Sequence, residues 1–323
     1  MGNSSDINTS IAGLYKAWRL FRRGKHASRA IIAFEYNLEA ELARLSCDIM
    51  TRTYKHSPYD YFEVKDSKRR MIAVASVRDR VVHRLLYEYL VSIYDKMFIY
   101  DVWSCRPGKG LQGAIQRTQR HMYTYRNGWL WRSDIRKFFD NIDHETLKIL
   151  LRRWITDKRA LWLLDEVVES YSSSGQTDGT GLAIGNLTSQ IFSNIYLHEY
   201  DRFVSHILRP LGYVRYGDDI VLWAQSERRA EVLAEQSRQF LAYTLHVALN
   251  PSSTVLQPVS RKLHYLGAEF WPSGHRLDAR MRARLRTNVS LMNFASYDAL
   301  ANARGTRGDR QVLRQLMLLQ HET

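Results

Sequence analysis

Gly212-Tyr-Val-Arg-Tyr-Gly-Asp-Asp-Ile-Val-Leu-Trp-Ala224 is the most informative stretch of this chain. Two short apolar runs flank a Gly-Asp-Asp tip, a pattern typical of a β-hairpin. Gly217 permits the bend that would turn the carboxylates of Asp218 and Asp219 in one direction. Neighbouring anions are commonly held together by a divalent cation, but Asp is also frequent in plain surface turns. The stretch therefore predicts either a metal-binding hairpin or an ordinary acidic turn.

The composition indicates a basic globular protein. The chain has 323 residues, of which 45% are hydrophobic, enough for one large domain or two to three small ones. Lys and Arg exceed Asp and Glu by 47 − 33 = 14, and the isoelectric point is about 9.8. This excess favours a polyanionic partner, most simply nucleic acid, over a surface that is basic only for solubility.

The cysteines and the apolar runs indicate the compartment. Cys47 and Cys105 are far apart and follow no metal-binding pattern, which argues against a disulfide framework or a zinc site. No apolar run approaches the length of a membrane span, and the N-terminus lacks a signal-peptide core. We therefore expect a cytoplasmic protein with no membrane partner.

The N-terminal part combines helical periodicity with one hairpin pattern. Apolar spacing predicts helices within residues 11–56 and from Val77 to Phe98. Residues 59–77 change to a period of two and predict a hairpin with its tip at Lys65–Lys68. Cations on this hairpin can fold over a triphosphate or simply keep the tip soluble. The basic cluster at residues 19–26 is likewise a nucleic-acid contact or a solvated helix end.

Asp134 ends a second predicted strand, which begins at Trp129 after the turn signal Asn127-Gly128. The order strand, Asp, Phe-Phe, helix favours a metal ligand over a helix cap, especially if Asp134 meets Asp218 in space. We expect the other elements at residues 111–125, 147–171, 191–208 and 227–245 (helices), 253–257 and 264–271 (strands), and from Arg276 onward (a cationic helical tail).

The segment Gly181-Leu-Ala-Ile-Gly-Asn-Leu-Thr-Ser-Gln190 follows a polar, Gly-rich loop that starts at Ser172. A Gly-rich approach to a helix N-terminus can accept anions or let a substrate come close to the backbone. The segment is not a Walker A loop, because no Gly-Lys-Ser/Thr follows it.

In this order the segments resemble the motifs of a reverse transcriptase. The resemblance covers residues 50–271 and is carried by Ser133–Phe139, Gly181–Gln190, Tyr216–Asp219 and Tyr265–Gly267, with Lys68–Ile72, Asp79–His83 and Cys105–Lys109 similar to finger motifs of bacterial reverse transcriptases. Ile184–Gln190 resembles the diversity-generating retroelement enzymes in particular, a type within the group II intron-like family. Intron, retron and retroviral relatives usually have a Gln-Gly start and a Ser-Pro end at this place.

The resemblance implies an α+β right-hand polymerase. Residues 1–125 would form N-terminal helices and α/β fingers. Residues 126–271 would form a ferredoxin-like palm, an antiparallel sheet plus helices that includes the loop and helix of residues 181–208. Residues 272–323 would form a helical, basic thumb.

The resemblance also implies the catalytic site of an RNA-directed DNA polymerase, a nucleotidyltransferase. Asp134 and Asp218 would hold two Mg²⁺ ions, with Mn²⁺ as the alternative; Asp219 would complete the catalytic cluster and Ile135 belongs to the metal site. Such ions lower the pKa of a primer 3′-OH and stabilise the leaving oxygens of the triphosphate. The residues implied in nucleotide binding are Lys68, Arg70, Phe139, Ile184, Gly185 and Gln190. Those implied in nucleic-acid binding are Arg106, Lys109, Tyr216, Tyr265, Leu266, Gly267, Arg280 and Arg284.

The resemblance implies a specific role for several of these residues. Lys68 and Arg70 would neutralise the triphosphate. Phe139 would exclude a ribose 2′-OH, or serve only as core packing, a role that we expect for Phe138. Gly185 would lie under the nascent base pair, and Tyr265-Leu-Gly267 would grip the primer.

Two positions depart from the family pattern. Ile184 stands where many relatives have a Gln near the nucleotide, and an apolar side chain cannot make the same hydrogen bonds. Base checking would then be looser. The segment Asn250–Thr254 lacks the Lys that often donates a proton to pyrophosphate, and either Lys262 or solvent could replace it.

The diversity-generating type implies a biological role. Such enzymes copy a template-repeat RNA from a primer and dNTPs into cDNA that is mutated mainly at adenines and replaces a variable gene segment, a process called mutagenic retrohoming. They work with a structured non-coding RNA and a small basic accessory protein. The alternatives are an antiphage-defence (antiviral) reverse transcriptase, a catalytically idle RNA-binding scaffold and a nucleotidyl cyclase. Intact Asp134, Asp218 and Asp219 argue against the scaffold, and a cyclase would not need the finger hairpin or the basic tail.

Overall fold

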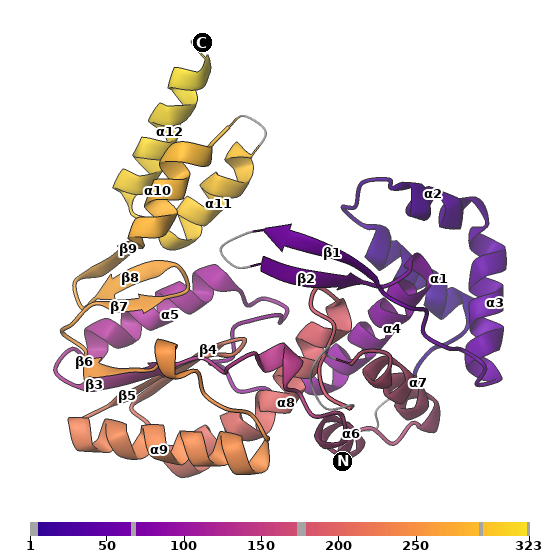
Figure 1. Cartoon of the computed structure of the whole chain (residues 1–323), viewed down its shortest axis with the longest axis horizontal. Coiled ribbons are helices and arrows are strands. Elements are labelled where there is room, and N and C mark those ends of the chain that lie inside the picture. The colour runs from indigo at the N-terminus through magenta and orange to yellow at the C-terminus, as the bar shows by residue number, and fades with distance from the viewer. Residues whose placement is uncertain (1–5, 66–68, 173–178, 291–292, 322–323) are drawn as a thin grey trace. The chain divides into compact units, whose positions relative to one another are not determined.

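A computed structural model describes residues 6–65, 69–172, 179–290 and 293–321 (Figure 1). The chain divides into two compact units, each built from separate stretches of sequence. The first unit contains residues 1–98, 137–199 and 241–247, and the second contains residues 99–136, 200–240 and 248–323. The tip of the first predicted hairpin and most of the Ser172–Gly181 loop lie outside the described residues.

A four-stranded antiparallel sheet is the centre of the second unit. Its strands are β4 (Gly212–Tyr216), β5 (Asp219–Ala224), β3 (Trp129–Ser133) and β6 (Val255–Pro258), in that spatial order. The predicted Gly-Asp-Asp hairpin is confirmed as β4–β5, and the predicted strand before Asp134 is confirmed as β3.

Helices cover both faces of this sheet. In Figure 1, α5 (Leu111–Thr124) lies on one face and α9 (Glu227–Thr244) on the other. The core on the α5 side is fully buried and apolar; among its members are Ile115, Met122, Leu130, Val221 and Trp223. Both helices were predicted, because each carries apolar residues at helical spacing over more than three turns.

A three-stranded sheet follows in sequence: β7 (Leu263–Tyr265), β8 (Ala268–Trp271) and β9 (Gly274–Leu277). The prediction of one strand over residues 264–271 is wrong, since the chain reverses at Leu266 and Gly267. Both residues have positive φ, 51° and 73°, and so form a tight turn instead of continuing a strand. Arg276, predicted to open the helical tail, lies in β9.

Three helices complete the second unit: α10 (Ala279–Asn288), α11 (Phe294–Arg304) and α12 (Arg307–His321). They share a small core with the end of β9, made of Leu277, Val289, Ala301 and Leu313. The helical character predicted for the tail is therefore confirmed from Ala279 onward.

The first unit begins with the helices α1 (Ile11–Arg22), α2 (Arg29–Tyr36) and α3 (Leu38–Met50), followed by α4 (Val77–Tyr94). Between α3 and α4 the predicted hairpin is confirmed as β1 (Asp60–Lys65) paired with β2 (Arg69–Val74). The helical stretch predicted to reach residue 56 ends at Met50.

The same unit contains a 3₁₀ turn (Phe138–Asp140), α6 (His144–Arg152), α7 (Lys158–Glu169) and the start of α8 (Leu187–Phe203). The single helix predicted over residues 147–171 is two helices. Asp157 begins the second of them, because its carboxylate caps the backbone N–H groups of Arg159 and Ala160. α8 starts four residues earlier than predicted and ends in a π-helical turn, Val204–Leu208. A last 3₁₀ turn, Pro251–Ser253, precedes β6 in the second unit.

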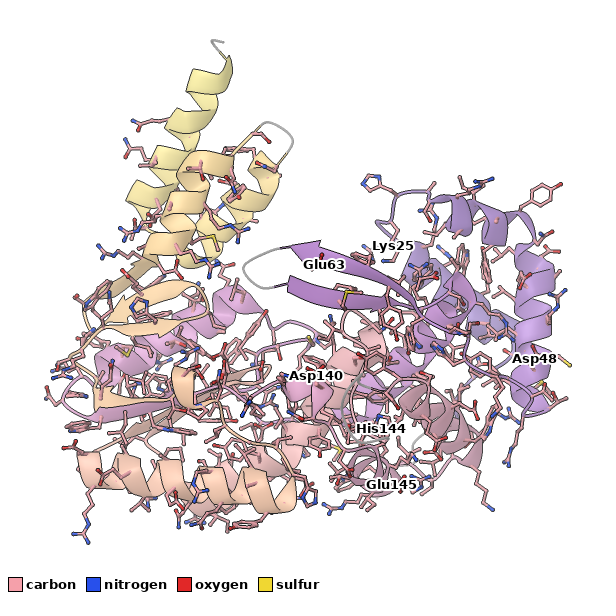
Figure 2. The ribbon with its side chains drawn as sticks, viewed as in Figure 1. Lys25, Asp48, Glu63, Asp140, His144 and Glu145 are labelled. Atoms are coloured by element: carbon pink, nitrogen blue, oxygen red, sulfur yellow. The ribbon has the colours of Figure 1, made fainter. Side chains whose placement is uncertain are left out.

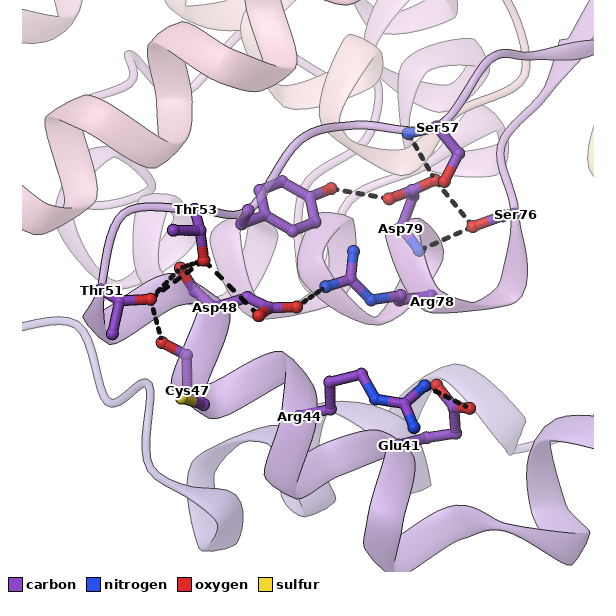
Figure 3. Close-up of polar contacts among 11 residues, drawn as sticks. Glu41, Arg44, Cys47, Asp48, Thr51, Thr53, Ser57, Ser76, Arg78 and Asp79 are labelled. Atoms are coloured by element: carbon purple, nitrogen blue, oxygen red, sulfur yellow. Dashed lines mark hydrogen bonds and ion pairs between the residues drawn. The ribbon is translucent and has the colours of Figure 1, made fainter.

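A buried carboxylate ties the start of β1 to the start of α4 (Figure 3). Asp79 accepts hydrogen bonds from the Tyr54 hydroxyl (2.8 Å), the Ser57 backbone N–H (3.1 Å) and the Ser76 hydroxyl (2.7 Å). Its charge is thereby satisfied although the residue is fully buried. This explains the Asp in the segment Asp79–His83 as a structural residue.

The helices in the described ranges include none that is both long and apolar enough to cross a bilayer.

Candidate active site

The register of the central sheet brings the predicted catalytic acids together where β3 ends and β5 begins. Ser133, the last residue of β3, pairs with Ile220 of β5, so continuing this register places Asp134, the residue after the strand, opposite Asp219. Tyr216 pairs with Asp219 across β4–β5, which leaves Gly217 and Asp218 as the two-residue turn. The chain separation of 84 residues between Asp134 and Asp218 is thus closed by two antiparallel strand pairings.

The turn is held through its backbone. Gly217 has a φ of +64°, which favours Gly, and its N–H donates to the Ser104 hydroxyl (2.8 Å). The carbonyl of Gly217 accepts from Arg215 Nη1 (2.8 Å), and the carbonyl of Asp219 accepts from the Tyr265 hydroxyl (3.3 Å). These contacts fix the position of the turn without using the carboxylates that it presents.

A fully buried ion pair lies under the turn. Arg215 Nε and Nη2 donate to the two carboxylate oxygens of Asp201 at 2.7 and 2.6 Å, and both side chains are 0% exposed. The hydroxyl of Tyr213 donates to the same carboxylate at 2.6 Å. Because each charge has a bidentate partner, the guanidinium can stay inside the unit and still reach the Gly217 carbonyl.

The burial and mutual repulsion of the three carboxylates favour a cation beside them. Burial, and then the neighbouring charges of Asp219 and Asp134, raise the pKa of Asp218 to about 6. Burial also raises the pKa of Asp219, although Arg132 opposes the shift. Carboxylates whose charged forms are disfavoured in this way gain most from a nearby positive charge.

Two side chains already contact the acids. Arg132 Nη2 donates to Asp219 Oδ1 at 2.6 Å, which is the diagonal contact expected from the Arg132–Val221 pairing. The Ser253 hydroxyl, from the turn before β6, donates to Asp134 Oδ1.

These contacts bear on whether the site suits a divalent metal. Within the described ranges, no group of three or more His, Cys, Asp or Glu side chains is arranged to hold an ion. The donor set nevertheless fits Mg²⁺ chemically: its oxygens are those of Asp134, Asp218 and Asp219, and they repel one another. Ile135, the residue after Asp134, is buried, and its side chain has no atom that could bind a cation.

Other predicted nucleic-acid contacts of the second unit are tied to their own loop. Arg106 Nη1 donates to the carbonyls of Ile99 (2.8 Å) and Val102 (3.3 Å). Lys109 Nζ donates to the carbonyl of Tyr100 (2.9 Å) and lies 3.4 Å from the centre of its ring. In this structure both cations therefore stabilise residues 99–109.

The remaining predicted residues of this unit differ in exposure. Tyr265 is 1% exposed and its pKa is raised by burial, so its ring supports the turn from inside. Leu266 and Gly267 form the β7–β8 turn, and Tyr216 packs partly buried against the core. Arg280 is exposed on α10, and Arg284, one turn later, is half-buried.

The first unit gathers the predicted nucleotide-binding residues. Leu182 N–H donates to the carbonyl of Phe139 (2.7 Å), and the buried ring of His144 (Figure 2) lies 2.7 Å from the Gly181 carbonyl. Asn186 Nδ2 donates to the carbonyl of Ala73 in β2 (3.1 Å). The Phe139 segment, the Gly-rich segment and β2 are thus joined to one another.

Within that arrangement the individual side chains are placed as follows. Phe138 is 2% exposed and belongs to the core as predicted, whereas Phe139 is only partly buried. Gly185 is exposed with φ +100°, and a Cβ there would come within 3.0 Å of Ile72 in β2. Ile184 is partly buried, Gln190 is exposed on α8, Arg70 lies in β2, and Lys68 lies outside the described residues.

Sequence reasoning missed the residues that support the acids: Ser104, Arg132, Asp201, Arg215 and Ser253. Arg215 carried a usable signal, because a charged residue inside an apolar strand needs a buried partner. The identity of that partner, and the roles of the two serines, depend on tertiary contacts that no local pattern encodes.

Comparison with known proteins identifies the family. Residues 62–270, more than half of the chain, match the family model described as reverse transcriptase (RNA-dependent DNA polymerase). The chain belongs to this family, whose members are RNA-directed DNA polymerases.

The relatives include intron-associated proteins and proteins of less specific name. Protein YkfC of Escherichia coli (strain K12) is 24% identical over 274 residues, 71% of each chain. The group II intron-encoded protein LtrA of Lactococcus lactis subsp. cremoris is 29% identical over 172 residues, 51% of this chain and 28% of LtrA. An uncharacterised 91 kDa protein in the cob intron of Schizosaccharomyces pombe is 30% identical over 150 residues, 45% of this chain and 18% of that protein. The chain thus matches less than a third of each of these two intron proteins.

Among solved structures, apo telomerase from Candida tropicalis, truncated from its C-terminal domain, has a similar fold. The TM-score is 0.52 at 12% identity, over 71% of this chain and 58% of that one. At this identity the likeness concerns the fold alone, a mixed arrangement of helices and sheets.

Proposed function

We propose that this chain synthesises DNA on an RNA template, with Asp134, Asp218 and Asp219 as its catalytic acids. The observation that carries the proposal is the sheet register, which sets Asp134 opposite Asp219 beside the Gly217–Asp218 turn. The raised pKa of Asp218 adds to it, because its causes are burial and then the negative charges of Asp219 and Asp134 beside it. Such a cluster costs stability and is explained by a cationic ligand.

Two divalent cations bound at these carboxylates would supply the acidity that activates the primer 3′-OH and the charge that stabilises the departing pyrophosphate. The chain's own part is to hold the carboxylates in place. Ser104, Arg215 and Tyr265 fix the backbone of the turn. Arg132 and Ser253 each occupy one carboxylate oxygen, and they would release it or share it when a cation binds.

The incoming dNTP is assigned to the first unit. Phe139 would close the space beside the sugar 2′ position, and Gly185, whose exposed backbone carries no Cβ, would let a base pair approach. Arg70 in β2 and Lys68 beyond it would neutralise the triphosphate. The hydrogen bonds that join β2, the Phe139 segment and the Gly-rich segment support one shared site for these residues.

On this proposal the chain is a right hand, with fingers in residues 1–125, a palm in residues 126–271 and a thumb in residues 272–323. The exposed Arg280 on α10 would contact backbone phosphate, together with Arg284. Such contacts weaken steeply as the salt concentration rises.

The first test is extension of a DNA primer on an RNA template with dNTPs and Mg²⁺. Asp218→Asn preserves the shape of the side chain and removes its charge, so we expect primer extension to fall by at least about a hundredfold. Asp60→Asn is the matched control, because Asp60 is an exposed carboxylate at the start of β1. Extension by Asp218→Asn at the control rate would refute the assignment. The assay is run with and without co-purified cellular RNA, which tests the need for a structured RNA.

We further propose that the enzyme is of the diversity-generating type and works with a structured RNA and a small basic accessory protein. The segment Ile184–Gln190 supports this, because Ile184 offers the nucleotide no hydrogen bond. Sequencing the cDNA should show errors concentrated opposite template adenines, and Ile184→Gln should lower them. Equal error rates opposite all four bases, or an unchanged rate in Ile184→Gln, would contradict this subtype but not the polymerase activity.

A further inference from the structure

A cavity of about 490 Å³ opens in the second unit beside the outer edge of the central sheet. Its walls come from the segment Ile99–Asp101, from α5, from the π-helical end of α8 and from Arg209–Tyr213 at the start of β4. The volume falls within the range typical of small-ligand sites. None of the residues assigned above to catalysis or to nucleotide binding lines it.

The cavity is cationic. Arg117, Arg120 and Arg209 line it against a single carboxylate, Asp101. Arg117 is committed to that carboxylate, with Nε and Nη2 at 2.7 and 2.8 Å from its two oxygens. Arg120 and Arg209 form no ion pair with any described residue, and both are exposed. Two guanidinium groups thus face the cavity without a counter-ion from the described chain.

His121 is a further residue of the cavity wall. His121 is 5% exposed and stacks on Tyr125, with the ring centres 5.4 Å apart. Burial, and then the charges of Arg117 and Arg120, lower the pKa of His121 to about 4. The imidazole is therefore neutral at physiological pH, and the positive charge of the site comes from the arginines alone.

The backbone around the cavity has two uncommon conformations, a π-helical turn and a non-Gly residue with positive φ. Arg209 has a φ of +45°, an uncommon conformation for a residue other than Gly, directly after the π-helical turn and before Pro210. π-helical turns and such backbone outliers are enriched at functional sites. Gly212 forms part of the wall, and a Cβ there would come within 2.9 Å of both His121 and Tyr125. The absence of a side chain at Gly212 is therefore what lets these rings line the space.

We propose that this cavity binds a phosphate group, with Arg120 and Arg209 as the residues that recognise it. Guanidinium groups form strong, charge-assisted hydrogen bonds to phosphate oxygens. Arg209 Nε already donates to the carbonyl of His206 (2.9 Å), so the phosphate would be recognised by the other N–H groups of Arg209 and by Arg120. Two sources share this chemistry: a free phosphate compound such as a nucleotide or pyrophosphate, and the phosphodiester backbone of RNA.

The cavity is separate from the catalytic turn but lies on the same strand. β4 runs from Gly212, in the cavity wall, to Tyr216, next to the turn, a length of about 13 Å at the usual rise of a strand. Asp101 adjoins both places, because its carboxylate holds Arg117 and its carbonyl accepts the N–H of Arg215 (2.9 Å). A ligand in the cavity would therefore bind the unit that contains the acids without occupying the place of their cations.

The test compares two double variants with equal loss of charge. Arg120→Gln with Arg209→Gln removes the two guanidinium groups proposed to bind phosphate. Arg228→Gln with Arg261→Gln is the control, because these are exposed arginines of the same unit, outside the cavity, with no ion pair among the described residues. Since all four side chains are on the surface, unchanged melting temperatures will show that both variants fold.

Binding is measured in EDTA, so that cations at the catalytic acids do not contribute. Inorganic pyrophosphate is titrated by calorimetry, and a labelled 12-nucleotide oligo(rU) by fluorescence anisotropy. We expect the cavity variant to lose roughly tenfold or more in affinity relative to the control, the effect of losing charged hydrogen bonds. If the cavity variant loses affinity for pyrophosphate, the ligand is a small phosphate compound. If it loses affinity for oligo(rU) alone, the ligand is the RNA backbone. Equal affinities of the two variants for both probes overturn the proposal, and the result does not depend on polymerase activity.

Discussion

Asp218→Asn should stabilise the metal-free protein at alkaline pH, although it removes a residue that we assign to catalysis. Burial and two neighbouring carboxylates raise the pKa of Asp218 from 3.8 to about 6. One pKa unit corresponds to about 1.4 kcal/mol, so holding this carboxylate ionised in the folded state costs about 3 kcal/mol. An Asn side chain has the same shape and no charge, and it removes that cost.

The direction of the pH dependence follows from the raised pKa. Below about pH 3 the carboxyl group of Asp218 is protonated in both the folded and the unfolded chain, and the two proteins should be equally stable. As the pH rises through 6, folding must ionise a group that binds its proton more tightly in the folded state, so the wild type loses stability and the variant does not. The difference should reach its full value of about 3 kcal/mol near pH 8.

Urea unfolding of both proteins between pH 4 and pH 8, in EDTA, measures this difference. Asp60→Asn serves again as the control and should follow the wild type at every pH, since Asp60 is exposed. A variant that is no more stable than the wild type at pH 8, or a difference that does not change with pH, would falsify the view that Asp218 is held in a repulsive cluster.

Three further predictions concern the surroundings of the acids. Adding Mg²⁺ at pH 8 should raise the melting temperature of the wild type more than that of Asp218→Asn, because the variant lacks a carboxylate that binds the ion. Calorimetric scans with and without Mg²⁺ measure the two shifts, and equal shifts would oppose a site at Asp218. Arg215→Met should lower the free energy of unfolding in urea by about 3–5 kcal/mol, because it leaves Asp201 buried and unpaired. Adding Asp201→Leu should restore part of this free energy, and a double variant no more stable than the single one would contradict the pairing. Phe139→Ala should raise the kcat/KM for ribonucleotides relative to deoxyribonucleotides by about tenfold or more in primer extension, and an unchanged ratio would leave Phe139 as packing only.

Much of the fold could be predicted because the relevant signals are local. The hairpin around Gly217 is marked by its flanking apolar runs, and the strand before Asp134 by a turn signal and an alternating pattern. The reversal at Leu266 was missed because its first residue is not Gly, and no propensity marks a Leu with positive φ. The break before Asp157 was missed because apolar spacing continues across it, although the cap itself was readable.

The site divides in the same way. The acids could be named from the sequence because their order and spacing form a family motif, and the register of the sheet then sets Asp134 opposite Asp219. The partner of Arg215 could not be named, because Asp201 lies on a helix that no local pattern connects to β4. The ion pair of Arg132 with Asp219 depends on a diagonal across two strands, and it exists only once the register is fixed.

The turn that presents Asp218 is stabilised through its backbone, whereas the unfavourable terms act on its side chains. Burial of the Asp218 carboxylate, and then its repulsion by Asp219 and Asp134, together cost about 3 kcal/mol. The opposing contacts act on the backbone: the Gly217 N–H on Ser104, the Gly217 carbonyl with the buried Arg215, and the Asp219 carbonyl with Tyr265. A hydrogen bond contributes about 0.5–1.5 kcal/mol, and up to about 3 kcal/mol when one partner is charged, so the three together are of the same size as this cost. The carboxylates themselves are contacted at one oxygen each in two cases, Asp219 by Arg132 and Asp134 by Ser253, and these contacts relieve part of the repulsion. Fixing the turn through its backbone keeps the acids in position, so that a bound cation would meet carboxylates already in place, which is the condition for a preorganised electrostatic site.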